Sequence, residues 1–407
     1  MPIARPQLIR RIRPFYEDGQ IKVITGMRRT GKSTLLRLIA DDLKVQQGRL
    51  EESFVFLNFE RMEWSHLTDP QALHEYLRQA VANAPVRATL FLDEIQNVRD
   101  WETCINSLRA DDCCDIFVTG SNSKLLSSEL ATHLAGRTIQ FQVFSFSFAE
   151  YCAARRAQSA EKLSDAALWR DYLIFGGMPG VVRYPTIEAA RQYLCDVFEG
   201  IVLKDVAQRW NIRQTYVLER VYRYLLAESG HRISAGNIEK YLKSEKLSLS
   251  RDALLEYMHA GVQTYAFEQA EGQDLQGKRV FRFQPKLYAA DHGFREAYFP
   301  GSNTRNIDQT LENIVCLELL RRGWTVRVGD AAGKEIDFIA ERNGVKCYIQ
   351  VTYLLSSDET VEREFAPLRT VPDNWPKLVL SLDPVCRSQD GIEHKNIMDF
   401  LLGDESV

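Results

Sequence analysis

The sequence lacks the features of a membrane, secreted or zinc-binding protein. No apolar run among its 407 residues approaches the ~18 that a membrane-spanning helix needs, and its arginine-rich start has no apolar core typical of a signal peptide. Its eight cysteines include no CxxC pair, and no histidine stands at zinc-ligand spacing. Repeats and low-complexity tracts are absent as well. We therefore expect a cytoplasmic globular protein with reduced cysteines and no membrane partner.

The net charge of −4 is small, but it is unevenly distributed along the chain. Residues 206–300 carry a net charge of +3, whereas residues 301–407 carry −6. A basic excess favours contact with nucleic acid, so the middle segment is the better candidate for binding DNA. The acidic end argues against a C-terminal domain that clamps nucleic acid by charge alone.

A glycine-rich stretch near the N-terminus, "ITGMRRTGKSTLL" at 24–36, has the spacing of a P-loop. In a P-loop, backbone N–H groups surround a phosphate, the lysine contacts its outer oxygens and the hydroxyl binds Mg²⁺. The sequence therefore predicts a site for ATP with Mg²⁺. Its loop residues are Gly26, Met27, Arg28, Arg29, Thr30, Gly31, Lys32, Ser33 and Thr34.

Residues 21–144 alternate between apolar, β-rich runs and helical patterns. Buried strands separated by helices predict a parallel sheet, with ligands at the carboxyl ends of its strands. The P-loop lies where this arrangement places a ligand, between a strand and a helix whose N-terminus favours an anion. The expected strands are 21–25, 53–59, 88–94, 115–120 and 138–144, and the expected helices are 32–46, 70–83, 101–110 and 122–130.

The strand "ATLFLDE" brings two carboxylates to the same edge of the predicted sheet. Asp93 is predicted to hold Mg²⁺ through water, with the Ser33 hydroxyl as a direct ligand. Glu94 is placed to orient or deprotonate the attacking water. A helix-capping pair is the alternative, but a position after a P-loop in an alternating α/β pattern favours the catalytic role.

Two further residues are candidates for contacting the phosphates. Asn122 follows the next strand and is predicted to sense the γ-phosphate, although Ser121 or Ser123 there has an equally good use as a helix cap. Arg137 precedes the last strand and is a candidate finger that reaches the phosphates of a neighbouring subunit. An ordinary surface arginine is the alternative.

The rest of the chain suggests three further segments. Residues 145–205 are mainly helical, and the turn "FGGMPG" at 175–180 interrupts them, as expected of a lid or connector. Helical patterns followed by two strands joined by a polar turn, within 212–290, predict a winged helix. A helix at 310–322 and the strands "TVRVG", "EIDFIAE" and "KCYIQVTYL" indicate a small α/β domain.

The chain also resembles a family. It contains, in this order, "GMRRTGKSTLL", "LFLDEIQNVRDWE", "VTGSNSKLLSSELATHLAGR", "FSFSFAEY", "FGGMP" and "EIDFIA…YIQVTY". The same series is typical of widespread prokaryotic AAA-type ATPases related to the archaeal and origin-recognition group. The resemblance covers nearly the whole chain. It implies an AAA-type core, a winged helix and a C-terminal domain similar to restriction-endonuclease folds.

Nucleases of the restriction-endonuclease fold use two metal-binding carboxylates and a lysine. Glu312, Asp337 and Gln350 match the family's first three positions, but Thr352 stands where the lysine belongs. Thr carries no positive charge, and Gln is a poorer metal ligand than a carboxylate. We therefore interpret this as a degenerate nuclease site. Lys346, which shares a strand face with Gln350, and Lys334 are candidates for a migrated lysine.

These observations predict an α/β protein: an AAA-type P-loop core (1–145), a helical lid (146–205), a winged helix (206–300) and a restriction-endonuclease-like domain (301–407). The expected activity is Mg²⁺-dependent ATP hydrolysis that drives a conformational switch or motor, with self-association, DNA or a protein as partner. Two alternatives stay open. One is an ATP-gated DNA nuclease, and the other is a regulatory ATPase that times a protein–protein contact without DNA.

Overall fold

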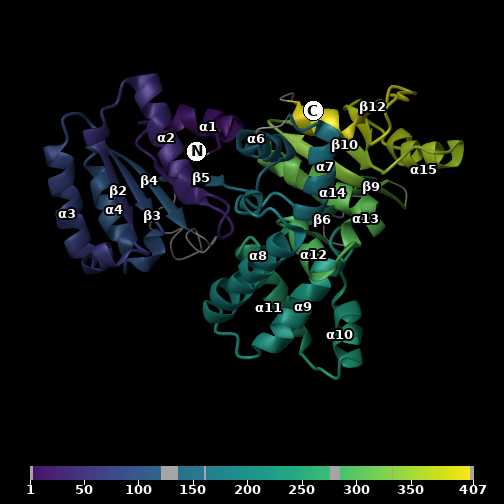
Figure 1. The fold of residues 1–407 in the computed structure, drawn as a ribbon, viewed down its shortest axis with the longest axis horizontal. Coiled ribbons are helices and arrows are strands. Elements are labelled where there is room, and N and C mark those ends of the chain that lie inside the picture. Colours follow the sequence, from purple (N-terminus) through teal and green to yellow (C-terminus); the bar gives the residue numbers. More distant parts are fainter. Residues whose placement is uncertain (1–2, 121–135, 160–161, 276–284, 332, 404–407) are drawn as a thin grey trace. The chain divides into compact units, whose positions relative to one another are not determined.

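The computed structural model describes residues 3–120, 136–159, 162–275, 285–331 and 333–403 (Figure 1). They form two compact units. Unit 1 comprises the chain up to Val143 together with Gln263–Tyr265, and unit 2 comprises Phe144–Val262 and the chain from Ala266 onward. Within the described ranges, no helix is both long and apolar enough to cross a membrane.

Unit 1 is built on a five-stranded parallel sheet, as the sequence predicts. The strand order is β2-β3-β4-β1-β5, so β1 and its P-loop lie between β4 and β5. All three central strands are buried along their whole length, which explains their apolar sequences. The strands are β1 (Ile21–Thr25), β2 (Phe54–Asn58), β3 (Ala88–Asp93), β4 (Cys114–Gly120) and β5 (Thr138–Gln142).

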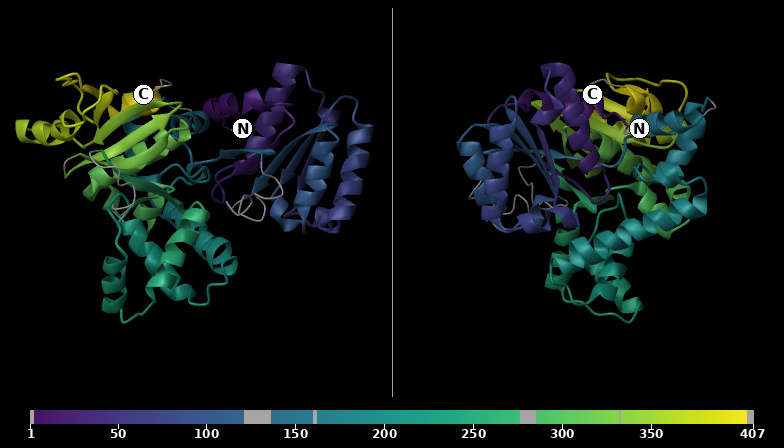
Figure 2. Two further views of the ribbon diagram at one scale, coloured as in Figure 1. Left: turned by 180° about the vertical axis from the view of Figure 1, so that it is seen from behind. Right: turned by 60° about the vertical axis from the view of Figure 1, so that its left-hand side comes forward.

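Helices cover both faces of this sheet (Figure 2). Helices α1 (Pro6–Ile12) and α2 (Lys32–Gln47) pack on the face that carries Phe91 and Phe117. The opposite face packs against α3 (Pro70–Asn83) and α4 (Trp101–Ala110). Asp69 begins α3 by accepting hydrogen bonds from two backbone N–H groups of its first turn. Short 3₁₀ turns lie at Arg13–Phe15, Glu51–Ser53, Met62–Leu67 and Ile95–Asn97.

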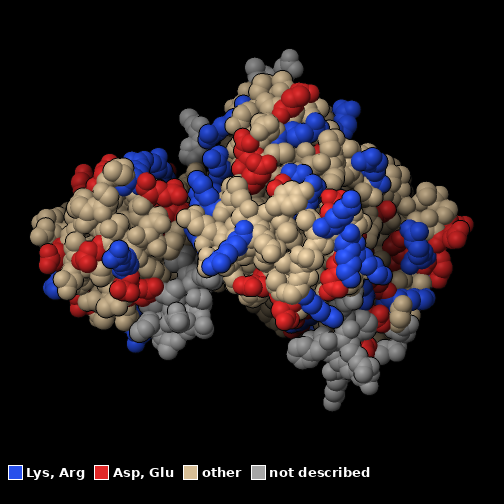
Figure 3. Space-filling view, turned by 90° about the horizontal axis from the view of Figure 1, so that it is seen from below, with Lys and Arg blue, Asp and Glu red and all other residues tan. Residues whose placement is uncertain are grey.

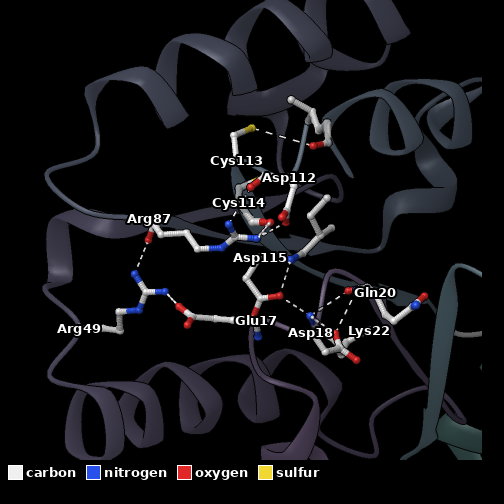
Figure 4. Close-up of polar contacts among 12 residues, drawn as sticks. Glu17, Asp18, Gln20, Lys22, Arg49, Arg87, Asp112, Cys113, Cys114 and Asp115 are labelled. Atoms are coloured by element: carbon white, nitrogen blue, oxygen red, sulfur yellow. Dashed lines mark hydrogen bonds and ion pairs between the residues drawn. The ribbon is translucent and has the colours of Figure 1, made fainter. Parts of the chain in front are cut away.

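A polar network joins the loops at the amino ends of these strands, opposite the P-loop (Figure 4). Lys22 on β1 and Asp115 on β4 form an ion pair in which both side chains are buried. Lys22 Nζ also donates to the backbone oxygen of Gln20 over 2.8 Å. Around this pair, Arg87 bonds the backbone oxygens of Asp112 and Cys114 over 2.6 and 3.2 Å. The network therefore fixes the edge of the sheet that is remote from the P-loop.

Replacing Lys22 with methionine is expected to lower the free energy of unfolding of unit 1 by about 3–5 kcal/mol. The substitution leaves the Asp115 carboxylate buried without its counter-ion, and burial already raises the pKa of Asp115. Urea unfolding followed by circular dichroism measures the change. Arg61→Gln is the control, since its ion pair with Glu63 is exposed and should contribute only about 0–1 kcal/mol. Equal losses in the two variants would contradict the prediction.

Unit 2 contains a seven-stranded mixed sheet in the order β12-β11-β10-β9-β8-β6-β7. The hairpin β6–β7 is antiparallel, and β6 continues the sheet by pairing in parallel with β8. The hairpin expected in the winged helix therefore shares a sheet with the C-terminal strands. The strands are β6 (Phe267–Asp274), β7 (Lys286–Ala289), β8 (Thr325–Ala331), β9 (Lys334–Arg342), β10 (Val345–Val351), β11 (Lys377–Ser381) and β12 (Glu393–Asn396).

Helices surround this sheet and extend from one end of it (Figure 1). The helices expected within 212–263 are present as α9, α10 and α11. The described helices are α6 (Phe148–Gln158), α7 (Asp165–Phe175), α8 (Ile187–Gly200) with a π-helical continuation (Ile201–Gln208), α9 (Thr215–Ala227), α10 (Ala235–Ser244), α11 (Arg251–Gln263), α12 (His292–Tyr298), α13 (Ser302–Arg305), α14 (Ile307–Arg321), α15 (Asp358–Arg369) and α16 (Ile397–Leu402).

The turn "FGGMPG" packs tightly inside unit 2. Gly176 has a φ of +70°, and a Cβ there would lie 1.9 Å from Asp291 Oδ1. A Cβ on Gly177 would lie 2.2 Å from the backbone oxygen of Phe146, and the Gly177 N–H donates to Asp291 Oδ2 over 2.8 Å. Only glycine fits at these two positions. The turn thus holds the helices around it against the start of α12.

Candidate nucleotide site

The P-loop closely follows the end of β1, and its glycines are required by the backbone. Gly26 has a φ of +138°, and a Cβ there would lie 2.3 Å from the backbone oxygen of Val143. Gly31 has a φ of +98° and directly precedes α2, whose first turn has no side-chain cap. The hydroxyl of Thr30 donates to the backbone oxygen of Met27 over 2.9 Å and fixes the loop from inside. Uncapped N–H groups at a helix N-terminus suit a bound phosphate.

Lys32 is buried at the centre of this loop. Its Nζ donates to the backbone oxygens of Gly26 and Met27 over 3.1 and 3.2 Å. The same nitrogen lies 3.7 Å from Glu94 Oε1, so the predicted phosphate-binding cation and the predicted catalytic carboxylate are neighbours. Two residues 62 positions apart in sequence are thus brought together by the pairing of parallel strands.

Asp93 is held by hydrogen bonds to both of its carboxylate oxygens. Thr119 Oγ1, near the end of β4, donates to Oδ1 over 2.6 Å. Asn58 Nδ2, at the end of β2, donates to Oδ2 over 2.6 Å. Donors from the two neighbouring strands therefore fix the orientation of the Asp93 carboxylate. Sequence reasoning missed Asn58 and Thr119, although each stands at the carboxyl end of an expected strand.

Glu94 adopts a left-handed backbone conformation, with φ +55° and ψ +48°. This conformation is uncommon for residues other than glycine and is frequent at functional sites. The Glu94 N–H donates to Thr119 Oγ1 over 2.9 Å, and Gln96 Nε2 donates to Glu94 Oε2 over 2.5 Å. The turn therefore presents the carboxylate to Lys32 in a fixed position.

Ser33 and Asp93 line the same cavity, which has a volume of about 450 Å³. The cavity continues along α2 and β2 past Phe56 and Trp64. A hydroxyl and a carboxylate facing one space are oxygen ligands of the kind that Mg²⁺ prefers, so these residues fit the ion. Thr34, the last predicted loop residue, is exposed on α2.

The structure describes some of the remaining candidate residues of the phosphate site, but not all of them. Asn122 and the expected helix 122–130 lie outside the described residues, so the sensor stays a prediction. Arg137 lies immediately before β5, at the amino edge of the sheet, and its Nη1 donates to Asn106 Oδ1 over 3.0 Å. Arg28 extends toward Glu60, with 3.6 Å between charged atoms, and Arg29 has a φ of +65°.

The predicted degenerate nuclease residues come together in unit 2. Asp337 Oδ2 accepts a hydrogen bond from the Val351 N–H over 2.8 Å, and Gln350 Oε1 accepts one from the Asp337 N–H over 3.4 Å. Glu312 is buried on α14, and Thr352 is buried just beyond β10. The part of the chain that the structure describes contains no group of three or more His, Cys, Asp or Glu side chains able to hold a metal.

Neither expected lysine occupies that cluster. Lys346 instead extends to 4.0 Å from Glu341, and Lys334 lines a cavity of about 440 Å³ with Glu335 and Gln350. The lysine that does contact the carboxylates is Lys286, which lies on β7. The sequence did not indicate this contact, because Lys286 lies in the hairpin and outside the nuclease motif.

A serine–histidine pair in unit 2 has the wrong hydrogen-bond direction for nucleophilic catalysis. His394 Nδ1 accepts from the Arg387 N–H over 2.8 Å, so the neutral ring carries its proton on Nε2. Nε2 then donates to Ser381 Oγ over 2.8 Å, and Ser381 donates to Asp383 Oδ2 over 2.7 Å. Burial lowers the pKa of His394, which keeps the ring neutral. The histidine is a donor here and cannot serve as the base.

Comparisons with known proteins agree with the architecture of unit 1. Residues 18–152 match the family described as "AAA domain", and residues 166–305 match a domain of unknown function (DUF8612). An uncharacterised protein of Haemophilus influenzae is 33% identical over 401 residues, which covers 98% of each chain. The uncharacterised protein MJ1544 of Methanocaldococcus jannaschii is 28% identical over 356 residues, 85% of this chain and 77% of the relative.

Solved structures are more distant. Cdc6p from Pyrobaculum aerophilum gives a TM-score of 0.33 at 14% identity, over 75% of this chain and 93% of that one. A mutant form of RuvB from Thermotoga maritima gives a TM-score of 0.33 at 16% identity, over 66% and 90%. On the sequence matches, the chain belongs to the family of AAA-domain proteins that includes the Haemophilus relative, and unit 1 is its AAA-family, ATPase-like domain.

Proposed function

We propose that this protein binds ATP with Mg²⁺ and hydrolyses it, and that hydrolysis switches the conformation of the chain. The observation that carries the proposal is the convergence of Lys32, Asp93 and Glu94 at one edge of the parallel sheet. Cation, metal-binding carboxylate and catalytic carboxylate are the parts that phosphoryl transfer to water requires.

Each residue has a distinct role in this proposal. Lys32 and the N-terminus of α2 bind the phosphates, while Ser33 and Asp93 hold Mg²⁺. Bound Mg²⁺ supplies charge that stabilises the phosphate oxygens. Glu94 positions the attacking water and accepts its proton, and Gln96 keeps the carboxylate in place. Thr119 links the Asp93 carboxylate to the backbone of Glu94, because its hydroxyl donates to Asp93 and accepts from the Glu94 N–H.

Removal of the Lys32 charge is expected to weaken ATP binding itself, by at least about tenfold, because the lysine of a P-loop contacts the outer phosphate oxygens. Lys32→Ala deletes the buried ammonium group and leaves Glu94 without its neighbouring cation. Titration with a fluorescent ATP analogue in Mg²⁺ measures the Kd. Lys240→Ala is the control, because Lys240 is an exposed lysine on α10 of unit 2. An unchanged Kd in Lys32→Ala would show that ATP binds elsewhere.

We also propose DNA as a partner of the helices α9–α11 and the hairpin β6–β7, interpreted as a winged helix. Lys240, Lys243 and Lys246 are exposed on α10 and the turn after it. Figure 3 views this side of the molecule, where Lys and Arg side chains gather with some acidic ones among them. Lys278, Arg279 and Arg282 of the expected basic hairpin lie outside the described residues.

Replacing Lys240, Lys243 and Lys246 with glutamine is expected to reduce DNA affinity and its salt dependence. Each phosphate contact that is lost should lower the slope of log K against log salt by about one. Fluorescence anisotropy at several salt concentrations, with and without ATP, measures both. The matched control replaces Lys334, Lys346 and Lys395, three lysines of the C-terminal sheet. If both triple variants bind like the parent, this surface is not the DNA contact.

A further inference from the structure

A buried lysine contacts Glu312 of the degenerate nuclease motif and a second carboxylate outside it. Lys286, the first residue of β7, is only 3% exposed. Its Nζ donates to Glu312 Oε2 on α14 over 2.9 Å and lies 2.6 Å from Glu335 Oε1 on β9. One ammonium group therefore lies between two carboxylates that come from different elements of unit 2.

Further protein groups donate hydrogen bonds to these two carboxylates and to Asp337. Tyr288 donates its hydroxyl to Glu312 Oε2 over 3.3 Å. Arg232 Nε donates to Glu335 Oε2 over 2.7 Å, and the Val351 N–H donates to Asp337 Oδ2 over 2.8 Å. Each of the three carboxylates therefore contacts at least one donor group of the protein itself.

The electrostatics of the cluster depend on Lys286. Burial raises the pKa of Glu312 and of Asp337, because desolvation disfavours their charged forms, and Lys286 opposes this effect at both. Burial by itself lowers the pKa of Lys286, but the carboxylates of Glu312, Asp337 and Glu335 outweigh it and raise that pKa. Lys286 is therefore charged and is the cation that makes burial of these acids tolerable.

We infer that Lys286 is the resident counter-ion of this cluster and occupies the place that a divalent cation would take between Glu312 and Glu335. Mg²⁺ bound to protein carboxylates lies about 2.0–2.1 Å from their oxygens, so it cannot share this space with an ammonium group already hydrogen-bonded to both. The cluster is an ionic lock and not a metal centre. This inference does not depend on the nucleotide site.

The ion pairs of this lock also connect separate elements of unit 2. It joins β7 of the hairpin to α14 and to β9, in addition to the parallel pairing of β6 with β8. A metal-dependent cleavage reaction at Asp337 would first require Lys286 to leave its two partners. We therefore expect no metal-dependent cleavage by unit 2 while the hairpin strand stays in place.

The test compares Mn²⁺ binding by the full-length wild type, Lys286→Met and Lys286→Met/Glu335→Gln, all without nucleotide. Methionine approximates the length of the side chain but removes its charge, so the carboxylates face an unfilled cation position. We expect Lys286→Met to unfold about 5–15 °C below the wild type in EDTA. Millimolar Mn²⁺ should restore part of this loss, and electron paramagnetic resonance should detect one more bound Mn²⁺ per chain than in the wild type.

The double variant should lose the additional Mn²⁺, whereas the wild type should show no Mn²⁺ binding that depends on Asp337. The inference is overturned if wild-type Mn²⁺ binding, or cleavage of supercoiled DNA in Mn²⁺, disappears in Asp337→Asn. It is also overturned if Lys286→Met matches the wild type in melting temperature and in bound Mn²⁺. If Lys286→Met does not fold, Lys286→Met/Glu312→Gln should regain solubility, because it removes an unpaired charge. The wild-type measurements of Mn²⁺ binding and DNA cleavage still test the inference in that case.

Discussion

Glu94→Gln is expected to reduce ATP turnover by a factor of about 10² to 10⁴ while leaving ATP binding intact. Glutamine keeps the size and shape of the side chain and can still accept a hydrogen bond from Gln96. It cannot accept the proton of the attacking water, and it loses the charge that lies 3.7 Å from Lys32. The steady-state rate of phosphate release and the Kd for ATP, measured on the same preparation, separate the two effects.

A matched control for this variant is Glu63→Gln. Glu63 is an exposed carboxylate that lines the cavity shared by Ser33 and Asp93, and its ion pair is with Arg61. Its replacement should leave turnover within about twofold of the parent, since an exposed ion pair contributes little. Turnover by Glu94→Gln at the parental rate would show that Glu94 is not the catalytic carboxylate. A lost affinity for ATP would instead assign Glu94 a role in binding.

The sequence predicted the helices, strands and loops that depend on a local pattern of residues. Apolar runs bounded by helical patterns placed β1 and β3, and the Asp69-Pro70 start signal placed α3 at Pro70–Asn83. The spacing of the glycines placed the P-loop at the start of α2. These features depend on neighbouring residues, which is why one sequence can predict them.

Contacts across the sheets were not predictable in the same way. Asn58 and Thr119 reach Asp93 because β3 lies between β2 and β4, and strand order is a property of the whole sheet. Lys286 reaches Glu312 and Glu335 because β6 pairs with β8, which the sequence pattern does not indicate. Which strands pair over long distances depends on the packing of the whole core. The nuclease motif could therefore indicate candidate lysines only on the strands that carry the motif.

Arg137 lies at the amino end of β5, beside the start of β1. Its backbone oxygen accepts from the Ile21 N–H over 2.9 Å, so Arg137 lies beside the first residue of β1, whereas the P-loop follows the last. A five-residue strand separates the two by roughly 13–17 Å. Arg137 therefore lies at the wrong edge of the sheet to contact phosphates bound to its own chain. A role as an arginine finger requires a second copy.

If Arg137 acts in trans, Arg137→Ala should reduce turnover strongly, and a partner chain that supplies the arginine should restore it. Arginine fingers contribute ~10³ to 10⁵ in rate where they have been measured. Glu94→Gln is the appropriate partner, because it keeps Arg137 but has no turnover of its own. In a mixture, the intact Glu94 of one chain and the Arg137 of the other complete one site, so activity should exceed the sum of the separate variants. Arg109→Ala, which removes a neighbouring arginine near Asn106, should retain parental activity. A mixture no more active than its components, together with an unimpaired Arg137→Ala, would remove the finger from the mechanism.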